Sequence, residues 1–406
     1  MLNQKTIDII KSTVPVLEVH GEAITKRFYQ MMFTNHPELL NIFNHANQKQ
    51  GRQQKALANT VYAAAQYIDQ LETILPVVTQ IAHKHRSLGI KPEHYPIVGE
   101  HLILAIKDVL KEAATDEIID AWTEAYGIIA DAFIGVEENL YEKAEKKVGG
   151  WKDFRSFKVV KKVEESAVIT SFYLKPADNG EISSFIPGQY ISVKVTIPGQ
   201  ANTHIRQYSL SDSSDKDYYR ISVKREAGDS NRPDGMVSTY LHSKIQEGDV
   251  LEISAPAGEF VLKNQYESPI VLLGGGVGIT PMMSMLNHLS HQIPQQKVNF
   301  IQAAFNGEHQ AFSDSVDKIV NENSNIKKYV YFEKPTDKDF ENNHFNGSGY
   351  ITANILDTII HDKQSTVYMC GPVSFMQAMY DALLEIGLKK ENIHYEFFGP
   401  ALTFKE

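Results

Sequence analysis

The sequence has almost no cysteine, since Cys370 is the only one among 406 residues. An intramolecular disulfide is therefore excluded, and so is any zinc or iron–sulfur site that needs several thiolates. Chains without disulfides are typical of reducing compartments, so we expect a cytoplasmic protein.

Long hydrophobic runs are also lacking. The longest apolar stretch, residues 269–285, contains four glycines and two prolines, which indicates a strand, a turn and a helix rather than a membrane span. Charged residues interrupt the N-terminal segment at Lys5, Asp8, Lys11 and Glu18, so we expect no signal peptide. We therefore predict a protein with no obligatory membrane partner.

An excess of positive charge is lacking as well. Lys and Arg number 40 against 50 Asp and Glu, which gives a formal net charge of −10. That charge repels a phosphate backbone, so nucleic acid is not expected as a partner. Hydrophobic residues make up 42% and charged residues 22%, which excludes a disordered chain, a collagen and a coiled-coil rod.

Three kinds of pattern follow one another along the chain. Residues 1–148 hold only 6 of the 25 glycines, and large apolar residues recur there at helical spacing. From residue 154 the period changes to two, with short strands separated by Gly/Pro turns, which indicates an antiparallel barrel. After residue 268 strands alternate with helices, which indicates a parallel sheet. We predict three domains, at 1–148, 152–263 and 267–406.

The strands expected from these patterns can be given by range. In the barrel they are 157–161, 169–174, 190–195, 219–224 and 248–253, with residues 206–209 in a further strand. In the last domain they are 270–273, 298–304, 329–332 and 367–369. A helix is expected from Pro281, and another from about Gly235.

Two segments of the last domains suit a ligand with phosphates. Residues 274–281 join a strand to a helix through four glycines, so free N–H groups and the positive helix end can face a pyrophosphate. A plain strand-to-helix turn explains this segment about equally well. Residues 206–209 offer an Arg fork and a Tyr ring, but alone they fit an ordinary surface strand better.

In order and spacing, these segments resemble the ferredoxin reductase-like flavoenzymes. The shared motifs also include Pro187-Gly188-Gln189-Tyr190, Gly235-Met236-Val237-Ser238 and Cys370-Gly371-Pro372. The resemblance implies an FAD-binding barrel followed by a nicotinamide-binding α/β domain. Its FAD-binding residues would be Tyr190, Arg206, Gln207, Tyr208, Ser209, Val237, Ser238, Glu396, Phe397, Phe398, Gly399 and Pro400. Its NAD(P)-binding residues would be Gly275, Gly276, Val277, Gly278, Ile279, Thr280, Pro281, Cys370, Gly371 and Pro372.

Two questions stay open in the reductase half. Cys370 is either a small neighbour of the nicotinamide or a nucleophilic or redox thiol. A 2′-phosphate usually meets an Arg, and residues 305–309 have none and carry Glu308. NADH is therefore favoured over NADPH.

His85 is a candidate iron ligand in the helical part. A haem ligand is a neutral imidazole whose second nitrogen is oriented by a partner. Ile81 and Leu88 make the helix face of His85 apolar, although a lone helical histidine is more often a surface residue. Glu137 lies four after Phe133, beside a buried position, and the adjacent Glu138 points about 100° away.

Nearly the whole chain resembles the flavohaemoglobins, in which a globin is fused to a flavin reductase. The motifs are Lys84-His85, residues 90–95, residues 98–102, Ala125-Tyr126-Gly127, Gly149-Gly150-Trp151 and residues 392–400. The resemblance implies that an all-α globin domain holds haem b, with His85 as the proximal ligand of the iron. Tyr95 and Glu137 would orient His85, and Tyr29 and Gln53 would be the distal polar residues. The haem pocket would also include Phe43, Leu57, Lys84, Val98, Leu102 and Tyr126.

The activity that this resemblance implies is nitric oxide dioxygenation. NO would be oxidised to nitrate with O2, with electrons passing from the nicotinamide through FAD to haem, for NO detoxification. Three alternatives remain: reduction of a peroxide or lipid hydroperoxide, sensing of O2 or NO, and a plain flavin reductase whose helical part holds no haem. The small-molecule substrates would be O2 and NO, and protein partners cannot be inferred.

Overall fold

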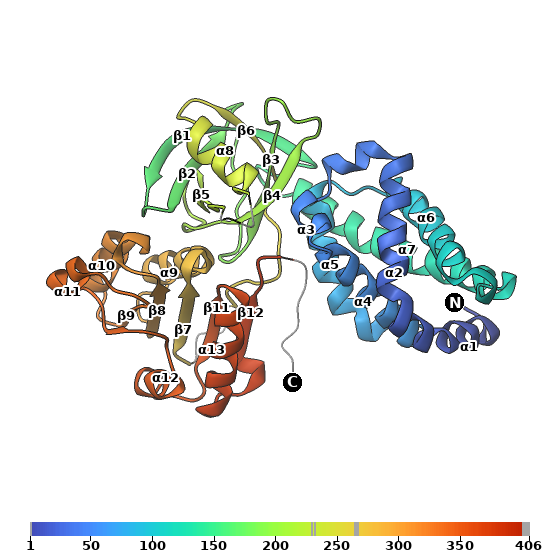
Figure 1. The fold of residues 1–406 in the computed structure, drawn as a ribbon. Helices are drawn as coiled ribbons and strands as arrows, with labels where there is room; N and C mark the ends of the chain where they lie inside the picture. Colours follow the sequence, from blue (N-terminus) through green and yellow to red (C-terminus); the bar gives the residue numbers. More distant parts are fainter. Residues whose placement is uncertain (1, 229, 231–232, 264–267, 400–406) are drawn as a thin grey trace. The chain divides into compact units, whose positions relative to one another are not determined.

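The structure, a computed structural model, describes residues 2–228, 230, 233–263 and 268–399 (Figure 1). Contacts between residues divide the chain into two compact units. The first contains residues 1–155 and 192–206, and the second contains residues 156–191 and 207–406. The expected order, a helical part, an antiparallel sheet and a parallel sheet, is confirmed.

The helical part of the first unit is built from seven α-helices in the described chain. They are α1 (Gln4–Ser12), α2 (Val14–Asn35), α3 (His45–Lys49), α4 (Arg52–Gln66), α5 (Leu75–Leu88), α6 (His94–Leu110) and α7 (Asp116–Glu145), with 3-10 turns η1 (Pro37–Asn41), η2 (Leu71–Ile74) and η3 (Lys111–Ala113). Thr115 caps α7, because its side chain accepts a hydrogen bond from the N–H of Ile118. Pro37 and Pro76 stand in the first turns of η1 and α5, where their missing N–H costs nothing.

The helices surround one apolar core. Helix α2 packs against α4 and α6, and α5 packs against α7. Phe28, Met32, Leu102 and Trp122 belong to the same buried cluster. The predicted distal residue Tyr29 belongs to it too, so the candidate site and the core of the helical part are continuous.

The antiparallel sheet has six strands in the order β4-β3-β6-β1-β2-β5. They are β1 (Phe154–Glu164), β2 (Ile169–Pro176), β3 (Tyr190–Val195), β4 (His204–Ser209), β5 (Tyr219–Lys224) and β6 (Val250–Ser254), with α8 (Met236–Lys244) between β5 and β6. β1–β2 and β2–β5 pair antiparallel. A bridge between Leu210 and Ile221 brings the chain after β4 to β5, so the two edges of the sheet meet, as in the predicted barrel.

The parallel sheet has the order β10-β9-β8-β7-β11-β12. Its strands are β7 (Ile270–Gly275), β8 (Val298–Ala304), β9 (Ile326–Phe332), β10 (Gly347–Ser348), β11 (Thr366–Cys370) and β12 (Ile393–Glu396). Its helices are α9 (Ile279–Gln292), α10 (Ser313–Glu322), α11 (Asp337–Asn342), α12 (Ala353–Ile359) and α13 (Val373–Glu385), with 3-10 turns η4 (Gly276–Gly278), η5 (Gly307–His309) and η6 (Lys390–Asn392). The sequence did not predict β12, and α9 begins at Ile279 rather than at Pro281.

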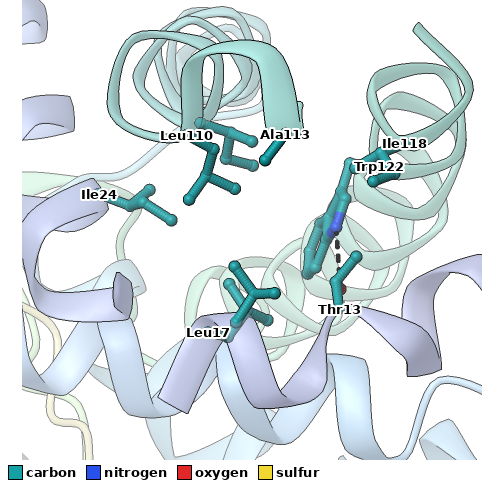
Figure 2. Close-up of a pocket in the computed structure, with 9 residues that line it drawn as sticks. Thr13, Leu17, Ile24, Leu110, Ala113, Ile118 and Trp122 are labelled. Atoms are coloured by element: carbon teal, nitrogen blue, oxygen red, sulfur yellow. Dashed lines mark hydrogen bonds between the residues drawn. The ribbon is translucent and has the colours of Figure 1, made fainter. Parts of the chain in front are cut away.

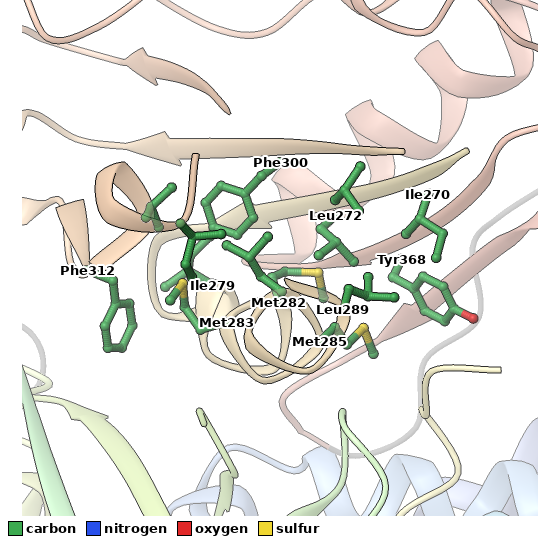
Figure 3. Packing of buried hydrophobic residues seen from close by; sticks show 14 of the residues in the cluster. Ile270, Leu272, Ile279, Met282, Met283, Met285, Leu289, Phe300, Phe312 and Tyr368 are labelled. Atoms are coloured by element: carbon green, nitrogen blue, oxygen red, sulfur yellow. The ribbon is translucent and has the colours of Figure 1, made fainter. Parts of the chain in front are cut away.

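Both faces of this sheet are covered. Alternate residues of β7 belong to two different clusters, Ile270 and Leu272 to one and Val271 and Leu273 to the other. Figure 3 shows the first cluster, where Ile279 and Met282 of α9 lie next to Phe300 and Leu272 of the sheet. Burial on both faces explains why β7 is a continuous apolar run and not an alternating one.

Candidate functional site

The structure brings His85, Tyr95 and Glu137 together from α5, α6 and α7. His85 Nδ1 donates to Glu137 Oε1 at 2.7 Å, and Tyr95 OH donates to the same oxygen at 2.6 Å. Because Glu137 occupies Nδ1, Nε2 is the nitrogen of His85 that can bind a metal. Glu137 is 2% exposed whereas Glu138 is exposed, which agrees with the expectation that only Glu137 faces His85.

The surroundings of Tyr95 set its protonation state and its position. Burial, followed by the charge of Glu137, raises the pKa of Tyr95, so its hydroxyl stays protonated and donates. Tyr126 OH donates to the backbone carbonyl of Tyr95 at 2.7 Å. A Cβ atom at Gly99 would lie only 2.5 Å from the Tyr126 ring, so the glycine allows α6 and α7 to approach closely here.

The predicted distal residues lie on α2, α4 and the segment between them. Tyr29 is 8% exposed, and its ring makes an edge-to-face contact with Phe43 at 5.7 Å between ring centroids. Burial raises the pKa of Tyr29, and the side-chain amide of Gln48 opposes this effect only in part, so Tyr29 keeps its proton. Gln53 Oε1 is buried and has no hydrogen-bond partner among the described residues. Leaving such an atom unpaired costs free energy unless a bound ligand or water supplies the partner.

The remaining predicted pocket residues form apolar walls. Phe43, Leu57, Val98 and Tyr126 are half-buried and pack on the cluster that contains Tyr29 and Leu102. Lys84 is half-buried on α5, directly before His85. Apolar walls with a few polar groups are typical of cofactor pockets.

The predicted flavin residues of the barrel lie on adjoining strands. The chain after β4 contacts the start of β3, because the N–H of Leu210 donates to the carbonyl of Gln189 at 2.9 Å. Tyr190, Arg206, Gln207 and Tyr208 are half-buried, and Ser209 is buried. Two aromatic rings and a guanidinium are thus accessible on these two strands.

The N-terminus of α8 is a further candidate contact for the flavin cofactor. Gly235 precedes it and, in the described structure, no side chain caps the helix. The first N–H groups of α8, which include Val237 and Ser238, are therefore available to an anion. The Ser238 hydroxyl already has backbone partners, because it accepts from Glu226 N–H at 3.1 Å and donates to the carbonyl of Gly235 at 3.0 Å.

The two predicted nicotinamide segments meet at the carboxyl ends of neighbouring strands. β7 and β11 pair in parallel, with Gly274 opposite Cys370. The strand order reverses between them, which is where open α/β sheets bind ligands. A Cβ atom at Gly278 would lie 2.2 Å from the carbonyl oxygen of Cys370, so only glycine lets these turns touch. Gly276 has a φ of +54° and faces open space.

Each of the two predicted nicotinamide segments leads into a helix. The helices that follow them, α9 and α13, also have no side-chain cap within the described ranges. The two segments hold the remaining predicted NAD(P) residues: Gly275, Val277, Ile279, Thr280 and Pro281 in the first, and Gly371 and Pro372 in the second.

The predicted flavin residues near the C-terminus reach the same edge. β12 pairs with β11, and Glu396 lies opposite Cys370. Phe397 packs edge-to-face on Tyr395 at 5.5 Å, whereas Phe398 is 48% exposed. Gly399 closes the described chain, and Pro400 lies outside the described residues. Of the predicted flavin residues, those that follow β12 therefore lie at the same edge of the sheet as the predicted nicotinamide segments.

Cys370 is fully buried, with 0% exposure. Burial and then the neighbouring charge of Glu396 raise the pKa of its thiol well above the ordinary value. A thiol needs its thiolate form to act as a nucleophile or redox group. The structure therefore favours a small apolar neighbour over a reactive thiol.

Comparison with known proteins finds three families along the chain. The families described as Globin, Oxidoreductase FAD-binding domain and Oxidoreductase NAD-binding domain match residues 26–133, 156–262 and 272–381. A flavohemoprotein from Bacillus cereus is 58% identical over 405 residues, which cover 100% of both chains. The chain belongs to the flavohemoprotein family. Flavohemoprotein A from Dictyostelium discoideum is 48% identical and covers 98% of both chains.

Solved structures show the same relationship. The flavohemoglobin of Malassezia yamatoensis, determined with bound FAD and heme, matches with a TM-score of 0.84 and 30% identity over 98% of this chain and all of its own. The FAD/NAD-binding domain of a nitric oxide dioxygenase from Vibrio cholerae matches 61% of this chain and 100% of its own, with a TM-score of 0.56 and 37% identity. This flavohemoprotein therefore uses haem, FAD and a nicotinamide dinucleotide.

The residues of this flavohemoprotein suit those groups. The Nε2 of His85, the Gln53 oxygen that has no partner within the described part of the chain, and the apolar side chains around them fit a haem. The uncapped ends of α8 and α9 fit cofactor phosphates. Among the described residues no helix has both the length and the apolar character to cross a membrane.

Sequence reasoning missed a buried polar group in the reductase half. Arg220 of β5 is 6% exposed, lies 3.4 Å from Asp212, and places its guanidinium 5.1 Å from the ring centroid of Phe312. Ser284 of α9 donates to the carbonyl of Asp212 at 2.7 Å. These contacts join the barrel to the nicotinamide domain. The sequence did offer one signal for this group, because Arg220 stands between Tyr219 and Ile221 in a predicted strand.

Sequence reasoning also missed a contact in the first unit. Residues 192–206, the β3–β4 hairpin, pack on the helical part of the flavohemoprotein. Thr203 N–H donates to Asn41 Oδ1 at 2.8 Å, and Ser192 Oγ donates to Ser87 Oγ at 3.0 Å. The rings of His45 and His204 lie 5.2 Å apart. These pairs are more than 100 residues apart in sequence, so no local pattern could reveal them.

Proposed function

We propose that this flavohemoprotein is an NAD(P)H-dependent nitric oxide dioxygenase that oxidises NO to nitrate with O2 and removes NO in the cytoplasm. The observation that carries the proposal is a buried tyrosine on α2 that keeps its proton, together with a buried amide oxygen on the adjacent helix α4 that has no hydrogen-bond partner among the described residues. The family membership and the Vibrio cholerae relative support the same activity.

Each part of the chain has a defined task in this proposal. When bound, the nicotinamide supplies hydride, the flavin passes electrons singly, and the haem iron supplies the centre at which O2 and NO react. Tyr29 offers its O–H to negative charge that develops on oxygen in the distal pocket. Its raised pKa keeps that donor available across the physiological range.

The proximal residues act through His85. Glu137 accepts a hydrogen bond from the Nδ1–H of His85 and so fixes the tautomer that presents Nε2. The carboxylate also makes the imidazole more electron-rich, and strong proximal donors favour cleavage of the O–O bond. Tyr95 donates a second hydrogen bond to the same oxygen of Glu137, so this buried carboxylate has two partners from two other helices.

The reductase residues bind and orient. The N–H groups at the start of α8 and α9 face cofactor phosphates, while the closely packed turns at Gly278 and Cys370 shape the nicotinamide site. We favour NADH, because residues 305–309, which follow β8, contain no Arg for a 2′-phosphate and carry Glu308. Comparing kcat/KM for NADH and NADPH decides this point.

The experiment that tests the function uses Tyr29→Phe in the holoprotein. We expect NO consumption to fall by about 10²-fold, the usual loss when one donor to developing charge is removed. Flavin reduction by NADH, followed by stopped-flow absorbance, should stay unchanged. Tyr62→Phe, which removes a hydroxyl from a half-buried tyrosine of the same domain, is the matched control.

Two outcomes contradict the proposal. Equal loss of NO consumption and of flavin reduction in Tyr29→Phe would show a general defect instead of a distal donor. Faster NADH turnover with an alkyl hydroperoxide than with NO and O2 would assign the distal pocket to peroxide reduction.

A further inference from the structure

Three buried amide atoms on α3 and α4 lack hydrogen-bond partners. Among the described residues, Gln48 Nε2 of α3 and the side-chain oxygens of Gln53 and Gln54 on α4 have none. Most buried polar groups of native proteins are paired, so each exception needs an explanation. The proposed function accounts for Gln53 alone, and the only donor among the three atoms belongs to Gln48.

The other buried polar side chains of the helices have partners. Within the described residues of α1–α7, no further buried side-chain atom is unpaired. In the apolar cavity of Figure 2, Trp122 Nε1 donates to Thr13 Oγ1 at 3.3 Å, and Thr13 Oγ1 donates to the carbonyl of Ile10 at 2.6 Å. None of the three glutamines lines that cavity. The unpaired amides are thus a local feature of α3 and the start of α4.

Gln54 holds the side chain of Gln48. Its Nε2 donates to Gln48 Oε1 at 2.9 Å and to the backbone carbonyl of Gln48 at 3.1 Å. Exchanging the amide oxygen and nitrogen of Gln48 would place two N–H donors against each other, so the hydrogen-bond network fixes this assignment. Because Oε1 faces Gln54, Nε2 lies on the opposite side of the Gln48 amide group.

The same network reaches the face of α2 that carries Tyr29. Thr25, which is 1% exposed, donates from Oγ1 to the backbone carbonyl of Gln54 at 2.9 Å. Thr25 and Tyr29 lie one turn apart on α2, so they share one face of this helix. Hydrogen bonds therefore connect Gln48 of α3 through Gln54 of α4 to the Tyr29 face of α2.

The electrostatic effect of Gln48 identifies the atom that faces Tyr29. The Gln48 side chain lowers the pKa of Tyr29, against the larger and opposite effect of burial. A donor that faces a phenol oxygen favours the charged form and lowers the pKa, whereas an acceptor has the opposite effect. Nε2 is therefore the atom of Gln48 that is turned toward Tyr29. Contacts of this kind often tighten only when a ligand binds.

We infer that Gln48 is a positioning residue of the distal pocket, which turns the O–H of Tyr29 toward the gas that reacts there. A phenol hydrogen has two positions in the plane of its ring, and an amide donor beside the oxygen disfavours the nearer one. The hydrogen then takes the other position and can be donated to a ligand. The inference rests on the proposed function for the role of Tyr29, and it adds the residue that sets the direction of that donor.

Gln48→Met in the full-length holoprotein removes the amide donor and keeps the length of the side chain. Carbon monoxide is the probe, because a hydrogen bond to its oxygen lowers the C–O stretching frequency in the infrared spectrum of the reduced protein. We expect the band of Gln48→Met to move to higher frequency, toward the band of Tyr29→Phe. Gln50→Met makes the same change at an exposed neighbour, the C-cap of α3, and should leave the band in place.

The double variant that combines Gln48→Met with Tyr29→Phe separates orientation from packing. If Gln48 acts through Tyr29, the double variant should have the CO band and the O2 dissociation rate of Tyr29→Phe alone. In Gln48→Met alone we expect O2 to dissociate about fivefold faster, which corresponds to the loss of one ordinary hydrogen bond. An unchanged band and rate in Gln48→Met, or full additivity of the two substitutions, would overturn the inference.

Gln54→Met covers the case in which Gln48→Met does not fold. It removes the group that holds Gln48 but leaves the Gln48 amide in place, so the O–H of Tyr29 is expected to occupy both of its positions. The CO band should then broaden or split into two. A single band at the native position would overturn the inference.

These measurements use CO and O2 and do not depend on turnover of NO. A protein that did not oxidise NO but showed the band shift and the faster O2 dissociation in Gln48→Met would disprove the proposed function and leave the role of Gln48 standing. NO dioxygenation together with an unchanged band and rate in Gln48→Met would do the reverse.

Discussion

At the scale of single residues, the chemistry of the proximal side depends on one buried carboxylate. Glu137 accepts hydrogen bonds from both His85 and Tyr95, and these come from two other helices. Charge-assisted hydrogen bonds are shorter and about twice as strong as neutral ones. The charge of Glu137, and not only its shape, is therefore expected to affect the iron.

Glu137→Gln tests this expectation. The amide oxygen can still accept a hydrogen bond, but the negative charge is lost, so the imidazole of His85 becomes a weaker donor to iron. We expect a lower iron–histidine stretching frequency in the resonance Raman spectrum of the reduced holoprotein. Glu138→Gln changes the same group at an exposed neighbour and should have no effect. An equal shift in both variants would disprove the role of Glu137.

Cys370, in contrast to Glu137, is expected to be chemically inert. Because burial raises the pKa of the thiol, we expect iodoacetamide at pH 8 to label Cys370 at least 100-fold more slowly in the folded protein than in guanidinium chloride. Cys370→Ala should retain flavin reduction by NADH within about threefold, since the role expected of this side chain is to be small. Rapid labelling with loss of activity would restore the reactive-thiol alternative.

The sequence carried much of this residue-scale information. The spacing of Phe133 and Glu137 favoured Glu137 over Glu138, because helix geometry separates adjacent side chains by about 100° so that only one of them can face His85, but it left the choice open. The unpartnered oxygen of Gln53 and the raised pKa of Tyr29 could not be read from sequence, since both depend on what surrounds each side chain in three dimensions.

At the scale of elements, the turns after β7 and β11 act as a pair. Gly278 lets the two turns touch at Cys370, whereas Gly276 faces open space. The alternating and apolar strand patterns predicted both turns, because each follows a clear run of strand residues. Strand β12 is only four residues long and half-buried over most of its length, so its sequence gave no pattern to detect.

Gly278→Ala and Gly276→Ala should therefore behave differently. In Gly278→Ala the new Cβ atom meets the Cys370 carbonyl, so we expect a lower Tm and a fall in kcat/KM for NADH of at least about tenfold. Gly276→Ala meets no protein atom, and its positive φ costs about 1 kcal/mol. We expect it to fold but to bind NADH more weakly. Differential scanning calorimetry and steady-state kinetics check both, and identical Tm losses would contradict this view.

The packing of the hairpin of residues 192–206 is expected to depend on pH through His204. Burial, then the charges of His45 and Arg206, lower the pKa of His204 below its ordinary value of about 6.5. Above that value His204 is neutral in folded and unfolded chains alike. As the pH falls below about 6.5, His204 becomes protonated in the unfolded chain but stays neutral in the folded hairpin. The unfolded form is thereby favoured, and the packing of the hairpin loses stability.

We expect amide hydrogen exchange in residues 192–206, corrected for intrinsic rates, to rise between pH 7.5 and 5.0. His204→Gln removes the titrating group and should make protection nearly independent of pH. His20→Gln, which replaces an exposed histidine of the same helical part, should leave the pH dependence unchanged. The same pH dependence in His204→Gln would show that another group is responsible.

At the scale of the whole molecule, three folding patterns share one chain. The change of period near residue 154 and again after residue 268 revealed the order of helical part, barrel and parallel sheet, and the structure confirms that order. The grouping of residues in space is different from the order along the chain, because the β3–β4 hairpin packs with the helices. No reading of local periodicity could show that grouping.

The contacts of this hairpin limit how the gene can be recombined. A chimera that joins the globin of one relative to the reductase of another at residue 150 would separate Asn41 and His45 from their matching partners Thr203 and His204. Crossovers at the linker are therefore expected to yield less stable proteins than crossovers that exchange residues 192–206 together with the globin. The natural exchangeable module has three breakpoints in the gene, after residues 155, 191 and 206, and a linker visible in the sequence marks only the first of them.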